Sequence, residues 1–288
     1  MTTPGQPREP RAQRARLGGE LRRLRMLAGL SGDALGQRLG TSQKTVSRIE
    51  LGEKLPSGPQ VTGWLQAVGA PEDRAAVVAG LLDAAVNEVA TFREMLAGGL
   101  AAVQRAAGEI EAASATVRNF QPGIIPGLLQ TADYAMRVMQ MANIRGAVDL
   151  AEAVTVRLAR QEALYAPGRR FEFIMTESAL RWRPGPPELL AAALGHVASV
   201  ATLETVDLAV IPADAEMHAI TRCGFILYED RTDGEPATVA IETPHAQLPV
   251  TDAGDVGLYR DQLALFRESA LTGTEAIEFV RSVTRSIS

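Results

Sequence analysis

The segment from residue 30 to residue 50 constrains the fold more than any other part of the chain. It places Ser31 and Ser42 at the start of two short stretches with helical spacing of apolar residues, and Gly40 between them. A serine hydroxyl can accept a hydrogen bond from the free N–H groups of a first helical turn, and glycine can adopt the left-handed backbone of a tight turn. The segment therefore predicts two short helices joined by a glycine turn.

The second of these helices, capped by Ser42 and running to about Glu50, is expected to have an apolar side and a polar side. At about 100° per residue, Val46 and Ile49 face one side. The opposite side carries Lys44, Ser47 and Arg48, flanked by Gln43, with Thr45 at the margin of the apolar side. Such a helix can dock on other helices while it offers hydrogen-bond donors to the major groove of DNA.

The polar side supplies the side chains that read DNA. Arginine and lysine can bond guanine, glutamine can pair with adenine, and serine or threonine can bond phosphate. The N-terminal residues of such a helix reach the base edges, and Arg48 can read bases or hold phosphate. We predict that the DNA-contacting residues are Gln43, Lys44, Thr45, Ser47, Arg48 and Lys54.

Flanking sequence completes an all-helical domain over residues 15–90. A first helix is predicted from the spacing of Leu17, Leu21 and Leu24, a fourth helix covers about 60–68, and Pro71 opens a fifth. Residues 1–14 are rich in proline, glycine and charge, so they are expected to form a disordered arm.

Charge separates the two parts of the chain. Residues 1–60 carry eleven basic and five acidic side chains, a net charge of +6, whereas the remainder carries −11. A basic segment attracts the phosphate backbone and an acidic one repels it, so polyanion binding is expected at the N-terminus. A solvated basic tail is the alternative explanation.

Residues 91–288 are predicted to form an α+β domain, so that the whole chain is α+β and mostly helical. Helices are expected at about 98–118, 128–142, 148–165, 188–203 and 256–269, with a possible continuation from Thr274. Short apolar runs predict four strands, at 171–175, 206–211, 224–228 and 238–242. Since three of these follow one another without a helix, the small sheet is expected to be mostly antiparallel.

Residues 17–68 resemble the helix-turn-helix domain of lambda-repressor and Cro type (XRE-like) regulators. The likeness is carried by the sequence TVSRIELG at 45–52, with Pro56 following. It implies an internal ion pair between Arg25 and Glu50, which makes Arg25 structural. Many members open the second helix with a glutamine where this chain has Gly32, so that contact to DNA is absent.

The second half resembles the antitoxin-like regulators of filamentous high-GC bacteria. The likeness is carried by NFQPGIIPGLLQTADY at 119–134, RLARQ at 157–161, TESAL at 176–180 and VIP at 210–212. It implies a regulator that is modulated by a small partner protein encoded nearby. The candidate effector or partner residues are Phe120, Gln130, Tyr134, Glu177 and Trp182, although the aromatic residues can equally fill core and Glu177 can be merely solvated.

Other classes of function find little support. His196, His218 and His245 are scattered, Cys223 is the sole cysteine, and no phosphate-binding glycine loop or nucleophile elbow is present. We therefore expect no enzymatic activity, no cofactor and no metal. The chain has no apolar run long enough for a bilayer and does not begin like a signal peptide, so it is expected to be cytoplasmic, without membrane contact.

Together these features predict a sequence-specific transcription regulator, a repressor or antitoxin-like protein that binds double-stranded DNA. We expect a homodimer, because two recognition helices about 34 Å apart match a palindromic site. The C-terminal domain would bind a small partner protein or an effector. The alternative is an antitoxin-like adaptor whose helical head binds protein rather than DNA.

Overall fold

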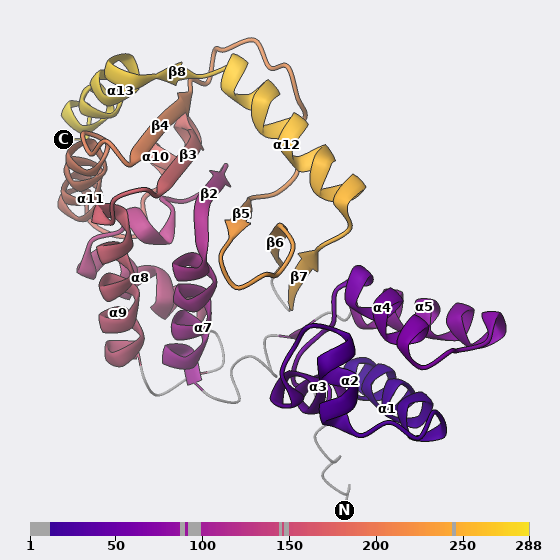
Figure 1. Cartoon of the computed structure of the whole chain (residues 1–288). Helices are drawn as coiled ribbons and strands as arrows, with labels where there is room; N and C mark the ends of the chain where they lie inside the picture. Colours follow the sequence, from indigo (N-terminus) through magenta and orange to yellow (C-terminus); the bar gives the residue numbers. More distant parts are fainter. Residues whose placement is uncertain are drawn as a thin grey trace, which may run out of the picture. The chain divides into compact units, whose positions relative to one another are not determined.

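The computed structural model describes residues 12–86, 90–91, 99–143, 146, 150–243 and 246–287. By internal contacts the chain divides into two compact units, residues 1–94 and 95–288 (Figure 1). Helix α1 (Ala12–Leu27) begins inside the segment 1–14 that was expected to be a disordered arm, so residues 12–14 are helical instead. Residues 1–11 of that segment lie outside the described residues.

The first unit is a cluster of helices around one small core. After α1 its elements are α2 (Gly32–Arg38), α3 (Gln43–Glu50), α4 (Gly58–Ala67), α5 (Glu72–Val86) and the short strand β1 (Ala90–Thr91). The core contains Leu17, Leu21, Leu35 and Trp64. The indole N–H of Trp64 donates to the Leu21 carbonyl at 3.2 Å, which fixes α4 against α1.

The turn between α2 and α3 follows the sequence pattern. The Ser31 hydroxyl accepts from the Ala34 N–H at 3.0 Å, and the Ser42 hydroxyl accepts from the Thr45 N–H at 3.2 Å. Gly40 has a φ of 64°, the left-handed conformation that glycine adopts without strain. The prediction of two capped helices joined by a glycine turn is confirmed.

Helices α1 and α3 approach each other backbone to backbone. A Cβ atom built on Gly18 would lie 2.4 Å from the Ile49 carbonyl oxygen and 2.6 Å from that of Glu50. Only a residue without a side chain permits this distance, because real Cβ atoms do not come so close to carbonyl oxygens. The position of α3 on the domain therefore depends on Gly18.

The second unit combines helices with one mixed sheet. Its helices are α7 (Gly99–Ala113), α8 (Ala132–Ala142), α9 (Leu150–Ala159), α10 (Glu177–Arg181), α11 (Pro187–Val200), α12 (Ala253–Glu268) and α13 (Gly273–Arg285), with the short 3-10 helices η2 (Gly127–Leu129) and η3 (Arg160–Tyr165). Its strands are β2 (Ser114–Gln121), β3 (Arg170–Thr176), β4 (Val206–Ile211), β5 (Phe225–Arg231), β6 (Thr238–Thr243), β7 (Ala246–Val250) and β8 (Leu271–Thr272).

Within this unit seven strands lie in the order β7-β6-β5-β2-β3-β4-β8, so the expectation of about four strands was wrong. The central strands β2, β3 and β4 are parallel, and the outer pairs are antiparallel. Strand β2 was predicted partly as helix because Arg118, Asn119 and Gln121 interrupt its apolar pattern. Strand β8 was not predicted because it has only two residues, and β7 was not predicted because Gln247 and Pro249 interrupt its apolar run.

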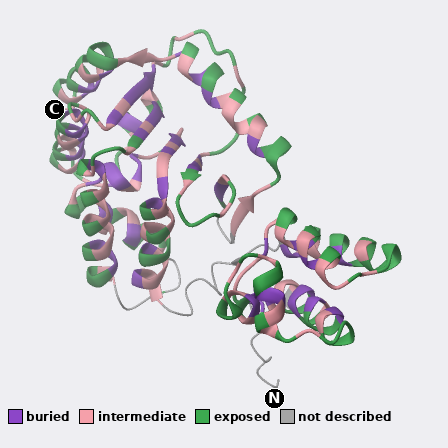
Figure 2. Ribbon diagram, in the orientation of Figure 1, coloured by how far each residue is buried: buried purple, intermediate pink, exposed green. Residues whose placement is uncertain are grey.

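Helices cover both faces of the sheet. On one face, Phe171, Phe173 and Val210 pack with residues of α8, α11 and α13. On the other, Phe120 and Ile174 pack with residues of α12. Buried residues accordingly gather along the central strands and on the inner sides of these helices (Figure 2). Among the helices of the described ranges, none has both the length and the apolar character of a membrane span.

Candidate nucleic-acid interface

Helix α3 has the two-sided character that the sequence predicts. Val46 and Ile49 are only 1% and 2% exposed, and both belong to the core of the first unit. The expected apolar side of the helix is therefore confirmed. These two side chains and the contact at Gly18 hold α3 on α1, which leaves the opposite side of the helix outward.

The outward side carries most of the predicted DNA-contacting residues. Gln43, Lys44 and Arg48 are exposed, and Ser47 and Lys54 are partly exposed. These positions present donors of the kinds that read base edges and phosphates. That these side chains contact DNA stays a prediction.

Thr45 differs from the other predicted contacts. Its hydroxyl lies 3.1 Å from the Ser42 hydroxyl, and its N–H donates to the same oxygen. The side chain is therefore part of the helix cap and only partly exposed. Thr45 therefore stabilises the start of α3, and its predicted contact to DNA would be a second role.

Arg48 is held loosely. Its Nε lies 3.9 Å from a carboxylate oxygen of Glu53, and the two side chains are 52% and 47% exposed. An exposed pair at this distance contributes little stability, at most about 1 kcal/mol. Arg48 can therefore exchange this partner for a phosphate or a guanine at small cost.

The ion pair implied by the likeness to lambda-repressor type domains is confirmed. Arg25 donates from Nε and Nη2 to the two carboxylate oxygens of Glu50 at 2.5 and 2.9 Å, and from Nη1 to the Leu30 carbonyl at 2.7 Å. The hydrogen bonds to Glu50 raise the pKa of Arg25 above its ordinary value. Arg25 thus connects α1 to the end of α3 and to the segment between α1 and α2.

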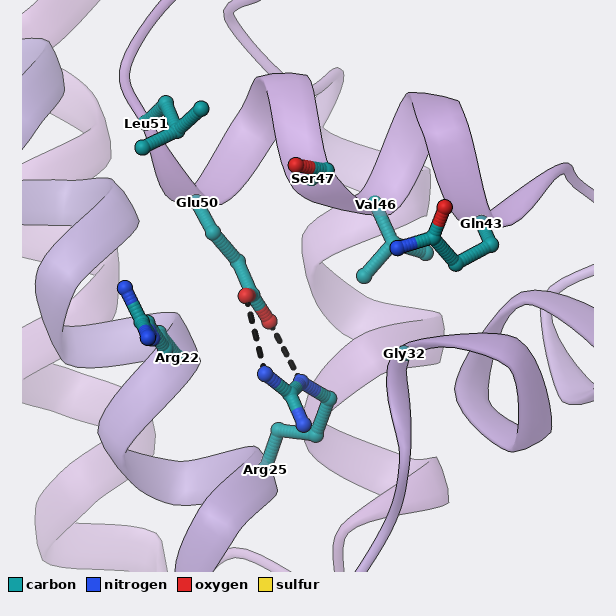
Figure 3. A pocket seen from close by; sticks show the side chains of 8 residues that line it. All are labelled: Arg22, Arg25, Gly32, Gln43, Val46, Ser47, Glu50 and Leu51. Atoms are coloured by element: carbon teal, nitrogen blue, oxygen red, sulfur yellow. Dashed lines mark hydrogen bonds and ion pairs between the residues drawn. The ribbon is translucent and has the colours of Figure 1, made fainter.

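A shallow hollow lies beside this ion pair, between α1 and α3 (Figure 3). Arg22 stands on one side of the pair and Gln43 on the other, and Gly32 at the start of α2 contributes no side chain to fill the space. Arg22 is exposed and forms no ion pair within the described part of the chain. Arg22 was not among the predicted site residues, although its position one helical turn before Arg25 places it on the same side of α1.

The candidate effector residues of the second unit do not lie around one site. Phe120 is fully buried on the α12 side of the sheet, stacked on Phe266 with ring centroids 4.1 Å apart. Tyr134 and Trp182 pack on the opposite side, 6.3 Å apart between centroids. The aromatic residues therefore fill two separate cores.

Gln130 is part of a buried polar network. Its side-chain oxygen accepts from Arg157 at 2.8 Å, its amide nitrogen donates to the Ile125 carbonyl at 2.7 Å, and its own carbonyl accepts from Gln161 at 2.7 Å. Arg157 also donates to Gln104 at 3.0 Å. Desolvation lowers the pKa of Arg157 to about 10. These bonds connect α7, the segment before α8, and α9.

Arg160 completes the network through a buried ion pair. It donates to both carboxylate oxygens of Glu111, at 2.8 Å from Nε and 2.5 Å from Nη2, and Glu111 is only 2% exposed. The sequence RLARQ at 157–161 therefore supplies hydrogen bonds inside the unit, between its helices, and does not form a surface site.

Glu177 has local partners. Its carboxylate accepts from the Ala213 N–H at 2.9 Å and from Arg181 at 2.6 Å. These two hydrogen bonds, that of Ala213 first, lower the pKa of Glu177. The side chain ties the end of β3 to the segment after β4. Across the described residues, no group of three or more His, Cys, Asp or Glu is arranged to hold a metal ion.

Comparison with known families agrees with the division into two units. Residues 16–78 match a helix-turn-helix domain, and residues 104–282 match a domain of unknown function, DUF5753. No curated protein is significantly similar to the chain. Because the second match covers more than half of the chain, the protein belongs to the family defined by DUF5753, and a helix-turn-helix domain precedes that domain.

Proposed function

We propose that the protein is a sequence-specific DNA-binding transcription regulator that places α3 in the major groove. The observation that carries this proposal is the outward edge of α3, where Gln43, Lys44 and Arg48 are exposed while Val46 and Ile49 anchor the helix. The match of residues 16–78 to a helix-turn-helix domain supports it. So does the net positive charge of the first 60 residues, because neutralising phosphates releases counterions.

We further propose how the regulator assembles and is controlled. The regulator acts as a homodimer on a palindromic site, since one small helical domain seldom binds a specific site tightly. It is a repressor or antitoxin-like protein, and the second unit receives a small partner protein or an effector. A monomeric mass in solution together with full operator affinity would contradict the dimer.

One observation favours a second candidate function, an adaptor whose head binds protein. Met26, Leu27 and Leu51 are 62%, 72% and 56% exposed at the ends of α1 and α3. Exposed apolar side chains such as the neighbouring Met26 and Leu27 can mark a protein interface. In this alternative the basic edge of α3 would bind an acidic surface of a partner protein, and the affinity for DNA would be weak and unspecific.

The test is a gel-shift titration of the full chain on the upstream region of its own gene at two salt concentrations. DNA binding must weaken steeply with salt. Lys44→Ala and Arg48→Ala should each weaken specific binding by about 1 to 3 kcal/mol without unfolding the domain. Arg105→Ala, which removes an exposed arginine of the second unit, is the matched control and should leave affinity unchanged.

Two outcomes would contradict the proposal. Unchanged operator affinity in both α3 variants would refute the assignment of the DNA-reading edge. Weak binding without sequence preference, combined with loss of a protein partner in a Leu27→Ser variant, would favour the adaptor.

A further inference from the structure

The α12 side of the sheet in the second unit changes from apolar to charged along its strands. Its apolar part includes Phe120, Ile174 and Ala209, which pack under α12. Two positions earlier on the same strands, and therefore on the same side, stand Arg118, Glu172 and Asp207. Arg118 is paired in register with Glu172, and Glu172 with Asp207, so the three form a row across β2, β3 and β4.

Helix α12 adds two arginines, Arg260 and Arg267, and both bind carboxylates of the sheet closely. Arg267 reaches Glu172 at 2.6 Å and Asp207 at 2.8 Å. Arg260 reaches Glu229 of β5 at 2.5 Å. Desolvation lowers the pKa of Arg267, but its bonds to Asp207 and Glu172 outweigh this and raise it. Both arginines are therefore held in place by carboxylates of the sheet.

Arg118 and Arg170 are held much less firmly. The Nε of Arg118 lies 3.3 Å from Glu229 and 3.5 Å from Glu172, and the nearer oxygen of Glu229 is buried without a hydrogen-bond partner among the described residues. The Nη2 of Arg170 lies 3.4 Å from Asp207, and this side chain is 70% exposed. A guanidinium carries five N–H donors, so most donors of both residues are uncommitted.

The four arginines line one open hollow. Its walls are Arg118, Arg170, Glu172, Arg260 and Arg267, with Leu263 and Ala264 of α12. Four guanidinium groups face three carboxylates, those of Glu172, Glu229 and Asp207, which leaves one net positive charge. The hollow is thus a positive, donor-rich site on a unit that carries more acidic than basic side chains.

We propose that this hollow binds the phosphate group of a small anionic ligand, with Arg118 and Arg170 as the donors that close on it. Guanidinium groups match the geometry of phosphate with paired, charge-assisted hydrogen bonds. A phosphate brings more negative charge than a single carboxylate, which suits four surrounding guanidinium groups. The flanking carboxylates and the acidic unit repel an extended polyanion, so the ligand is a small molecule and not nucleic acid.

The experiment is a calorimetric titration of the full chain with pyrophosphate at constant ionic strength, with succinate as the carboxylate comparison. Arg118→Gln and Arg170→Gln remove the proposed donors, and Arg105→Gln is the control on another surface of the same unit. Because the basic segment of residues 1–60 also attracts anions, a Lys44→Ala, Arg48→Ala double variant is titrated in parallel. This variant separates the hollow from the DNA-binding edge.

We expect one saturable pyrophosphate site that is weakened about tenfold or more in each hollow variant and unchanged in the control and head variants. Arg170→Gln alters an exposed side chain, so it decides the matter even if Arg118→Gln disturbs the fold. No saturable binding, binding that Arg170→Gln leaves intact, or equal affinity for succinate would each overturn the proposal.

Discussion

Helix α3 of the first unit and the sequence RLARQ of the second unit use arginine in opposite ways. In the first unit Arg48 and Lys44 are exposed on the outer side of α3, whereas Arg25 of α1 pairs with Glu50. In the second unit the arginines of the characteristic sequence RLARQ turn inward, to Gln104, Gln130 and Glu111. The same residue type therefore lies on the surface at the edge of α3 and forms internal hydrogen bonds in RLARQ.

A motif rich in polar residues is therefore not by itself a binding site. Burying a charge is costly unless it is paired and hydrogen-bonded, so an inward arginine is accompanied by acceptors from other elements. Arg160 meets this condition through Glu111 of α7. Where such acceptors are few, as for Arg48, the side chain remains available for a ligand.

Glu111→Gln should have the greatest effect on stability. This change removes the carboxylate that the buried Arg160 binds directly, while Arg157 beside it bonds only the amides of Gln104 and Gln130, and it should cost the second unit about 3 to 5 kcal/mol of unfolding free energy. Urea-dependent hydrogen exchange of peptides from this unit measures the loss. Glu152→Gln breaks an exposed pair with Arg105 and should cost under about 1 kcal/mol. Equal losses in both variants would contradict an internal role for RLARQ.

The second prediction concerns the stability of the helical domain of the first unit. Gly18→Ala places a Cβ against the carbonyl oxygens of Ile49 and Glu50, so α1 and α3 must separate, at about 3 kcal/mol. Faster hydrogen exchange of α3 peptides measures this loss of stability, and operator binding should be lost as well. Gly19→Ala is the matched control, because its Cβ meets nothing within 4 Å and alanine favours the helix by up to about 1 kcal/mol. Destabilisation by both changes would show that the close contact is not the cause.

The head was largely predictable because its determinants are local. Ser31, Gly40 and Ser42 lie within a dozen residues of one another, and each specifies its own helix end or turn. Val46 and Ile49 follow from helical periodicity alone. Strand β4 was predicted with its observed bounds for the same reason, since Val206–Ile211 is one apolar run.

The second unit was less predictable because its polar residues have distant partners. Arg118 sits in β2 opposite Glu172 and near Glu229, which lie more than fifty and a hundred residues further along the chain. When these partners are unknown, as they are from the sequence alone, Arg118 only interrupts the apolar pattern that would predict a strand. Gln130 likewise looks like a surface residue until Arg157 is placed beside it.

A smaller effect sharpens the assignment of the DNA-binding edge. Arg22 is exposed at the hollow that Gly32 also lines, whereas its neighbour Arg23 is bound to Glu20 at 2.6 Å. We expect Arg22→Gln to weaken specific and unspecific DNA binding alike and to reduce the salt dependence by about one phosphate contact. Salt-dependent fluorescence anisotropy measures both. Arg23→Gln should change neither, and an equal response would mean that general charge alone acts.

The smallest effect is a pH dependence confined to the second unit. The Nε2 of His196 is buried without a hydrogen-bond partner in the described structure, and burial lowers the pKa of this histidine. The unfolded chain, where its pKa is near 6.5, therefore binds the proton first, so stability is full above that pH and declines as pH falls below it. The lowered pKa of Glu177 acts only at more acidic pH, below the ordinary carboxylate range. Urea unfolding between pH 7 and 5 should therefore show a decline that His196→Gln removes, and an unchanged slope in the variant would assign the decline to another group.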